Sequence, residues 1–200
     1  MYKFNAALFA AISAAQGVKD IRYYLNGVHL CPAIGGGAHI VATNGHVLFC
    51  AFDPNAEIAE PVTLAIDASA IKAFAKVDGQ ISLDDGVQLL SLNGKDISFA
   101  VIKLEGKFPE WRRVVPSLGA RKTPVNTCAA TIEYIARLAK LFPWHWPAAR
   151  FHITGHDASI LATHPDFSDR FAVIMPLRAK PDEVENAIAY VENILHHQAA

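Results

Sequence analysis

The sequence predicts an α+β fold in which short helices alternate with groups of strands. Segments with helical periodicity start near residues 5, 67 and 126, and each is followed by several strand-like runs. Two-residue turn signals at residues 84–86 and 93–94 are typical of tight hairpins between such runs. Short sequences also recur in the same order along the chain, which indicates that one structural unit is used more than once.

The first helix is predicted over residues 5–15, with Asn5 as its N-cap and Leu8, Phe9 and Ile12 on one face. Strands are expected at residues 22–31, 39–52 and 61–66. The glycines at 35–37 and the Asp-Pro-Asn sequence at 53–55 mark turns between them.

Asp67 is expected to cap a second helix, which turns Ile71, Phe74 and Ala75 inward. The strands that follow are predicted at residues 80–83, 87–92 and 96–104. Pro109 and Pro116 bracket an exposed connection that ends near residue 118.

A third cycle follows, with Asn126 or Thr127 as the N-cap of a helix that continues to residue 141. Strands are expected at residues 150–154, 159–163 and 171–176. The apolar stripe of this helix consists of Ile132, Ile135, Leu138 and Ala139.

Residues 181–196 are predicted as an amphipathic C-terminal helix that begins at Pro181. Its stripe packs within the chain or across an interface between chains. The stripe comprises Val184, Ile188, Val191 and Leu195.

Two internal repeats support a repeated unit. The sequence FAVI at residues 99–102 recurs at 171–174, and IKAFAK at 71–76 matches IARLAK at 135–140 in pattern. The two offsets, 72 and 64 residues, differ by eight, the length of a proline-rich insert at 142–149. We therefore predict three βαβββ units. The expected organisation is a two-unit domain at 1–118, a one-unit half domain at 119–180 and a helical tail at 181–200.

The composition excludes several classes of protein. With 52% hydrophobic and 18% charged residues the chain fills a core, and its net charge of −1 argues against polyanion binding over the whole surface. Cys31, Cys50 and Cys128 form no CxxC pair, so neither a disulfide framework nor a cysteine zinc site is indicated. No signal peptide and no apolar run of roughly 18 residues occurs. A cytoplasmic protein without membrane contact is expected.

Four motifs, at residues 20–27, 41–48, 106–116 and 173–178, together resemble the bacterial DNA polymerase III beta subunit, the sliding clamp. Residues 20–27 (DIRYYLNG) look like the opening of its middle domain, and residues 41–48 (VATNGHVL) are similar to the V-A-T-D-G-H-R-L run of that domain. Residues 106–116 (GKFPEWRRVVP) resemble the segment that closes the same domain. Residues 173–178 (VIMPLR) resemble the C-terminal V-V-M-P-M-R. The order and spacing of the motifs suit the family, with residues 1–118 matching the middle domain and 119–179 about half of the last.

The chain departs from the family pattern in several places. It has no counterpart of the first clamp domain, and the last domain is reduced to one unit. Asn44 stands where the family has Asp, Val47 replaces a basic residue, and residues 179–200 extend past the family's end.

The resemblance implies a DNA-clamp fold whose inner helices contact duplex DNA through phosphates, which suits sliding. Basic side chains lie four apart on the second predicted helix and three apart on the third, although ordinary solvated helix faces would show the same pattern. A strand with one tyrosine in the core is the alternative for residues 22–24. The candidate DNA-binding residues are Lys19, Arg22, Tyr23, Tyr24, Lys72, Lys76, Arg137 and Lys140.

The resemblance also implies a groove for short peptides with apolar anchors. For Val173 and Met175, the alternative explanation is that they simply continue a buried strand. The tail at residues 181–200 would cover the groove, pair with a neighbouring subunit or extend freely. Carried over residue by residue, the groove comprises Leu25, Thr43, Gly45, His46, Val47, Leu48, Pro116, Val173, Met175, Pro176, Leu177 and Arg178.

No metal, cofactor or catalytic site is predicted. His152 and His156 lack a third ligand at a fixed spacing, and His145, His196 and His197 have no partner pattern. No GxSxG, P-loop or GxGxxG motif occurs, so an enzyme is not expected. A metal-dependent enzyme built on the histidines remains the weakest alternative, and it predicts stoichiometric metal in the purified protein.

The leading function is therefore a sliding-clamp-like replication accessory (processivity) factor, with a phage or other mobile element as its expected source. Its partners would be double-stranded DNA, without sequence preference, and clamp-binding peptides of polymerase or other replication proteins. The odd unit suggests a symmetric dimer, and a closed ring would be a tetramer. The rival is an interaction protein that keeps the fold, does not encircle DNA and modulates the partners of a host clamp.

Overall fold

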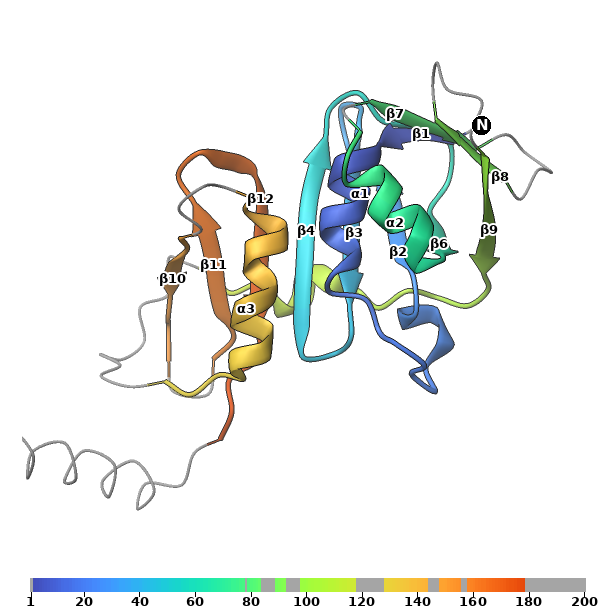
Figure 1. Cartoon of the computed structure of the whole chain (residues 1–200). Coiled ribbons are helices and arrows are strands. Elements are labelled where there is room, and N and C mark those ends of the chain that lie inside the picture. Colours follow the sequence, from blue (N-terminus) through green and yellow to red (C-terminus); the bar gives the residue numbers. More distant parts are fainter. Residues whose placement is uncertain are drawn as a thin grey trace, which may run out of the picture.

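Twelve strands form one antiparallel sheet in the part of the chain that the structure, a computed structural model, describes (Figure 1). The described residues are 2–77, 79–83, 89–92, 98–117, 128–143, 148–155 and 158–178. The strand order is β10-β11-β12-β4-β3-β2-β6-β9-β8-β7-β1-β5. This mixed architecture confirms the predicted α+β class.

The first two units follow one another along the chain, and each has the order βαβββ. The first consists of β1 (Tyr2–Asn5), α1 (Ala6–Ser13), β2 (Val28–Pro32), β3 (Ala38–Thr43) and β4 (Val47–Asp53). After the short β5 (Glu57–Ile58), the second consists of β6 (Val62–Ile66), α2 (Ala68–Phe74), β7 (Gln80–Leu83), β8 (Leu89–Leu92) and β9 (Ser98–Leu104).

These two units are joined reciprocally. The first strand of each unit pairs with the second strand of the other, β1 with β7 and β6 with β2, and α1 packs beside α2. Asn5 caps α1 by accepting the Leu8 amide at 2.9 Å, and Asp67 caps α2 by accepting the amides of Ser69 and Ala70, both at 2.8 Å. Both predicted caps are confirmed.

The third unit consists of α3 (Ile132–Leu141), β10 (Arg150–His152), β11 (Ile160–His164) and β12 (Phe167–Ile174). Its last strand pairs with β4 from Arg170↔Ala51 to Ile174↔Val47, so the sheet continues from the first unit into the third. In place of a first strand, the described residues before α3 form a single bridge, Ala129↔Leu177. Both internal repeats occupy corresponding elements, with FAVI in β9 and β12 and the helical repeat beginning in α2 and α3.

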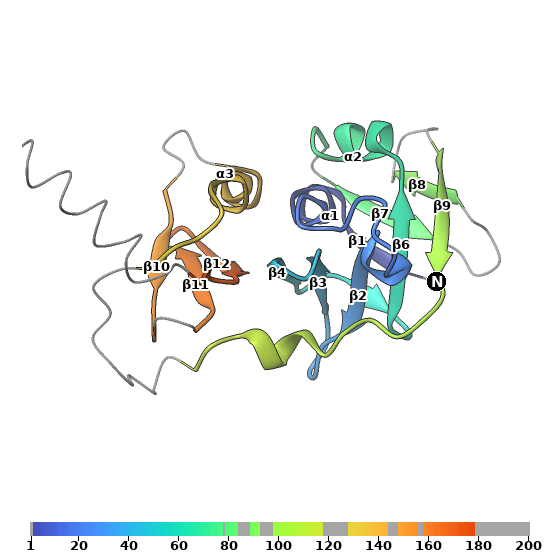
Figure 2. The ribbon, with the colours of Figure 1, turned by 90° about the horizontal axis from the view of Figure 1, so that it is seen from below.

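The helices and the segment that follows β9 lie on opposite sides of the sheet (Figure 2). The main core lies under the helices and contains Phe4, Phe9, Phe49 and Phe74, all fully buried. A smaller cluster, which includes Leu25, Leu48, Trp111 and Val173, lies on the other side beneath the 3-10 turn η2 (Trp111–Val114). This second cluster forms the floor of the candidate site.

Two predicted strands differ from the structure. Residues 22–31 begin with a 3-10 turn, η1 (Tyr23–Leu25), because Asp20 and Asn26 bond to the local backbone and hold it in a loop. Residues 39–52 form two strands, because the Asn44 side chain accepts the amides of His46 and Val47 at 2.9 and 3.0 Å and makes a turn.

The third helix begins later than predicted, at Ile132 with Thr131 as N-cap; the expected caps Asn126 and Thr127 lie outside the described residues. Its predicted apolar stripe is only partly buried, because Leu138 is buried whereas Ile132, Ile135 and Ala139 are exposed. The predicted C-terminal helix over 181–196 and the turns at 84–86 and 93–94 also lie outside the described residues.

None of the helices in the described ranges is long and apolar enough to cross a bilayer.

Candidate functional site

A groove of about 230 Å³ lies where the first domain, which consists of the first two units, meets the third unit. The β3–β4 turn and the end of β12 form one wall, and the segment that contains η2 forms the other. Its lining consists of Arg22, Tyr24, Leu25, Thr43, Gly45, His46, Val47, Leu48, Pro109, Glu110, Trp111, Val114, Val173 and Met175.

The β3–β4 turn is fixed by its own side chains. The Thr43 hydroxyl donates to the Val47 carbonyl at 2.8 Å and accepts the Gly45 amide at 3.0 Å. Gly45 has φ +89°, and a Cβ there would lie 2.9 Å from the Arg22 guanidinium. The left-handed backbone therefore favours glycine at this position, and any side chain there would displace the Arg22 guanidinium.

Arg22 ties the η1 loop to this turn. Its guanidinium donates to the Asn44 carbonyl at 3.1 Å and to both Asp20 carboxylate oxygens, at 3.0 and 2.7 Å. The hydrogen bonds from Arg22 lower the pKa of Asp20 to about 2. Arg22 is consequently held in place at the rim of the groove as one half of an ion pair.

Both walls are attached to the third unit, at the far end of the chain. The Met175 amide donates to the His46 carbonyl at 2.8 Å, which joins the end of β12 to the β3–β4 turn. The His46 ring stacks on Tyr134 of α3, with ring centroids 6.0 Å apart and an interplanar angle of 8°. The Ser159 hydroxyl donates to the Val114 carbonyl at 2.8 Å, so the η2 segment is also attached to the third unit.

The floor of the groove is apolar and its rim carries the polar groups. Leu25, Val47, Leu48 and Val173 are each at most 3% exposed, whereas Met175 is 41% exposed. Such a site offers a hydrophobic pocket with an adaptable side chain at its mouth. Among the described residues, no group of three His, Cys, Asp or Glu side chains is placed to hold a metal ion.

The structure brings together most of the residues assigned to the groove from the sequence, and it adds others. Arg22 and Tyr24, expected at a DNA surface, line this groove. Sequence reasoning missed Pro109, Glu110, Trp111 and Val114 as lining residues. Four of the expected residues are not in the lining: Pro116, Pro176, Leu177 and Arg178.

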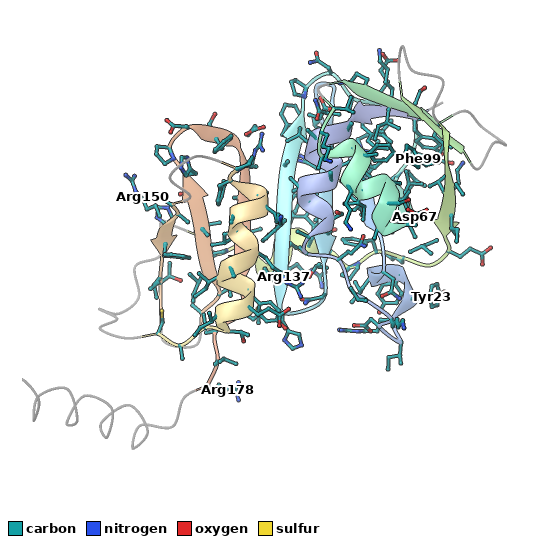
Figure 3. All side chains as sticks on the ribbon, viewed as in Figure 1. Tyr23, Asp67, Phe99, Arg137, Arg150 and Arg178 are labelled. Atoms are coloured by element: carbon teal, nitrogen blue, oxygen red, sulfur yellow. The ribbon has the colours of Figure 1, made fainter. Side chains whose placement is uncertain are left out.

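The remaining candidate DNA-binding residues divide between two places. Lys72 and Lys140 line a second hollow, of about 1040 Å³, between α1, α2 and α3. Lys76 is exposed just after α2, and Lys19 is exposed on the loop that precedes η1. Tyr23 is exposed in η1 itself (Figure 3). Arg137 donates to the Glu133 carboxylate and to the Ala14 carbonyl, the latter at 3.2 Å, so its charge is already paired.

No protein-family model matches the chain, whereas individual proteins match it. The chain is 25% identical over 184 residues to the beta sliding clamp of Proteus mirabilis, a match that covers 89% of this chain and 50% of the relative. It is 28% identical over 159 residues to the beta sliding clamp of Pseudomonas aeruginosa, covering 77% of this chain and 43% of the relative.

Solved structures show the same fold. A DNA polymerase sliding clamp from Pseudomonas aeruginosa matches with a TM-score of 0.67 and 18% identity, covering 90% of this chain and 66% of that one. A sliding clamp from Bartonella birtlesii bound to griselimycin matches with a TM-score of 0.67 and 16% identity, covering 88% and 66%. The fold is therefore that of the DNA sliding clamps.

The chain is therefore similar in sequence to the bacterial beta sliding clamps, and it shares the fold of the solved sliding clamps. It spans about half the length of the curated relatives that it matches.

Proposed function

We propose that the protein is a clamp-type DNA replication accessory factor that binds short segments of partner proteins in the groove between the β3–β4 turn, the end of β12 and the η2 segment. The observation that carries the proposal is the groove itself, which is built from segments more than a hundred residues apart and has an apolar floor. The similarity to beta sliding clamps supports a role of this kind, in binding rather than in catalysis.

The chemistry of the groove suits a peptide with apolar anchors. Full burial of one Leu, Met or Phe side chain against such a floor contributes about 1.5–3 kcal/mol. The Met175 side chain adapts its shape to different anchors because its three torsions are free and its sulfur is polarisable.

The charges in the groove limit the peptides it accepts. Val47 is buried where the family carries a basic residue, so this position cannot pair with a peptide carboxylate. Arg22 is engaged by Asp20, and Glu110 forms an ion pair with Arg112 at 3.6 Å. We therefore expect the anchor residues, rather than acidic flanks, to provide most of the affinity.

Griselimycin is a suitable first probe, because sliding clamps of Pseudomonas aeruginosa and Bartonella birtlesii have been solved with it bound. A fluorescent peptide that copies the clamp-binding segment of a bacterial replicative polymerase would serve as the second probe. Binding of both to the wild-type protein would be measured by calorimetry and anisotropy.

Met175→Glu places a charge at the mouth of the groove and should weaken binding of both probes at least tenfold. Ile102→Glu is the matched control, because Ile102 is 61% exposed on β9 and does not line the groove. Absence of binding of either probe to the wild-type chain would reject the proposal, and so would equal losses in the two variants.

Duplex DNA is proposed as the second ligand, held on the side of the sheet that carries the helices. Lys72 and Lys140 line the hollow between the helices, and Lys76 lies beside it, which suits contacts with phosphates and no base reading. Such binding should weaken steeply as the salt concentration rises.

A second candidate function is a clamp-fold interaction protein that does not encircle DNA. It is favoured by the weak charge of the helical side: α1 contributes no basic side chain, and Arg137 is paired with Glu133. Retention on nicked circular DNA that is lost when the circle is cut would establish a sliding clamp. Peptide binding without such retention would establish the second function.

A further inference from the structure

Apolar side chains are exposed on the side of the third unit that faces away from the first domain. Ile132 and Ile135 of α3 are 81% and 39% exposed, and Phe151 and Ile153 at β10 are 43% and 37% exposed. A hollow of about 270 Å³ between these elements is lined by apolar residues alone, among them Ile135, Leu138 and Phe151. Contiguous exposed apolar surface of this kind marks an interaction site.

In the first domain, two units lie side by side, and each covers the surface of the other that is exposed in the third unit. There, Leu64 of β6 pairs with Val28 of the other unit, and Ile81 of β7 pairs with Phe4. Leu64 and Ile81 are both fully buried as a result. Each unit therefore completes the other by two strand pairings and one helix contact.

The third unit has the same parts without the partner. Thr131 occupies the N-cap position of α3, and Asp67 occupies that of α2, 64 residues earlier, so Cys128–Ala130 correspond to Leu64–Ile66 of β6. Leu64 is buried, whereas Cys128 is exposed. Within the described residues the outer edge of β10 pairs with no strand, so both edges that joined the first two units are open here.

The partner that the third unit lacks is a unit of its own kind, because the first two units complete each other through equivalent strands. A further unit of the same kind is available from a second copy of the chain.

We propose that two copies pair through their third units about a two-fold axis and so build a second two-unit domain across the chains. The exposed face of α3 packs against its equivalent, and the edge of β10 pairs with the 128–130 segment of the partner copy. A two-fold axis places the same patch on both sides, as a self-complementary interface requires. The groove lies at the opposite edge of the third unit, next to β12, so this pairing leaves it accessible.

The test is the mass in solution, measured by light scattering and sedimentation over a range of concentrations. The wild-type chain should reach twice its monomer mass of 21.7 kDa. The double variant Ile135→Asp with Phe151→Asp should be monomeric. Ile34→Asp is the matched control and should remain dimeric, because Ile34 is fully exposed in the turn between β2 and β3.

Deletion of residues 181–200 separates this proposal from a tail that covers the same face. The sequence stripe of Val184, Ile188, Val191 and Leu195 would suit that role. We expect the shortened chain to remain dimeric. A monomeric wild-type chain, a double variant that stays dimeric, or a deletion that abolishes the dimer would each overturn the proposal.

Hydrogen exchange of the wild-type chain provides a test without substitutions. Dilution below the dimer dissociation constant should reduce the protection of the backbone amides of β10 and leave those of β3 unchanged; equal protection in β10 at all concentrations would contradict the interface. Binding of griselimycin by the monomeric double variant shows that it is folded, and it distinguishes failure of this interface from failure of the groove.

Discussion

The first domain and the third unit use one structural unit in two different surroundings. The sequence FAVI occurs in β9 of the first domain and in β12 of the third unit. In β12 the last three of these residues are at most 2% exposed, because the strand lies between β11 and β4. In β9 only Val101 is buried and Ile102 is 61% exposed. Position in the sheet, rather than sequence, decides which residues of the repeat form core.

The helices show the same difference. Phe74 of α2 is fully buried and packs edge-on against Phe99, with ring centroids 5.1 Å apart. Leu138, its counterpart in α3, is buried at 5% exposure, but the neighbouring Ile135 is open to solvent. The predicted stripe of α2 is better covered than that of α3, because Ile71 is half-buried beside Phe74, but the prediction that Ala75 turns inward is wrong, since Ala75 is exposed.

Truncation of the two corresponding core residues should give the largest contrast. Phe74→Ala is expected to lower the free energy of unfolding by about 3–5 kcal/mol, because it opens a cavity in a closed core. Leu138→Ala should cost about 2–3 kcal/mol, because its site borders an open hollow and relaxes more easily. Urea unfolding followed by circular dichroism measures both. Equal losses would show that the third unit is packed as tightly as the first domain.

The first domain should also carry a distinct sensitivity to acid. The His29 ring stacks on Phe108, with centroids 4.4 Å apart, and Nδ1 lies 3.0 Å from the Thr63 hydroxyl. Burial lowers the pKa of His29 to about 4, so the unfolded chain takes up this proton near pH 6.5 and the folded chain only near pH 4. Stability is therefore lost as the pH falls from about 6.5 to 4, by roughly 2–3 kcal/mol.

His29→Leu removes the group that takes up this proton. The free energy of unfolding should therefore fall less steeply between pH 6.5 and 4 in this variant. Some acid sensitivity remains, because burial also lowers the pKa of His39. Unfolding midpoints in urea at pH 7, 5.5 and 4.5 provide the measurement. An unchanged slope in His29→Leu would mean that the ring is more accessible to water than its stacking on Phe108 implies.

Local signals in the sequence predicted the units well. Asn5 and Asp67 are caps whose side chains bond to nearby amides, and such bonds depend only on neighbouring residues. The same reasoning failed at η1, because the bonds of Asp20 and Asn26 across the loop give no periodic pattern. It also placed the cap of α3 too early, at Asn126 or Thr127, whereas the helix begins at Ile132 after Thr131.

The groove was less accessible to sequence reasoning. Met175 and His46 are brought together by one backbone hydrogen bond across 129 residues, and only the resemblance of both segments to one family linked them beforehand. Trp111 and Val114 were missed because they lie in a proline-bracketed connection that was expected to be exposed. Their signal was their size: a buried Trp in a connection must cover an apolar surface.

The smallest expected contrast is between the two helix caps. The Asn5 side chain accepts the Leu8 amide at 2.9 Å, whereas Thr131, the cap of α3, makes no hydrogen bond from its side chain. Asn5→Ala should therefore cost about 1 kcal/mol and Thr131→Ala at most a few tenths. The bond from the Asn5 amide to Asp53 at 2.7 Å persists in the variant, so the loss reports the side chain alone. Thermal unfolding resolves this difference. A loss of stability in Thr131→Ala as large as that in Asn5→Ala would mean that the Thr131 hydroxyl has a hydrogen-bond partner in solution. If that loss appears only in the dimer, the proposed pairing of third units provides the partner.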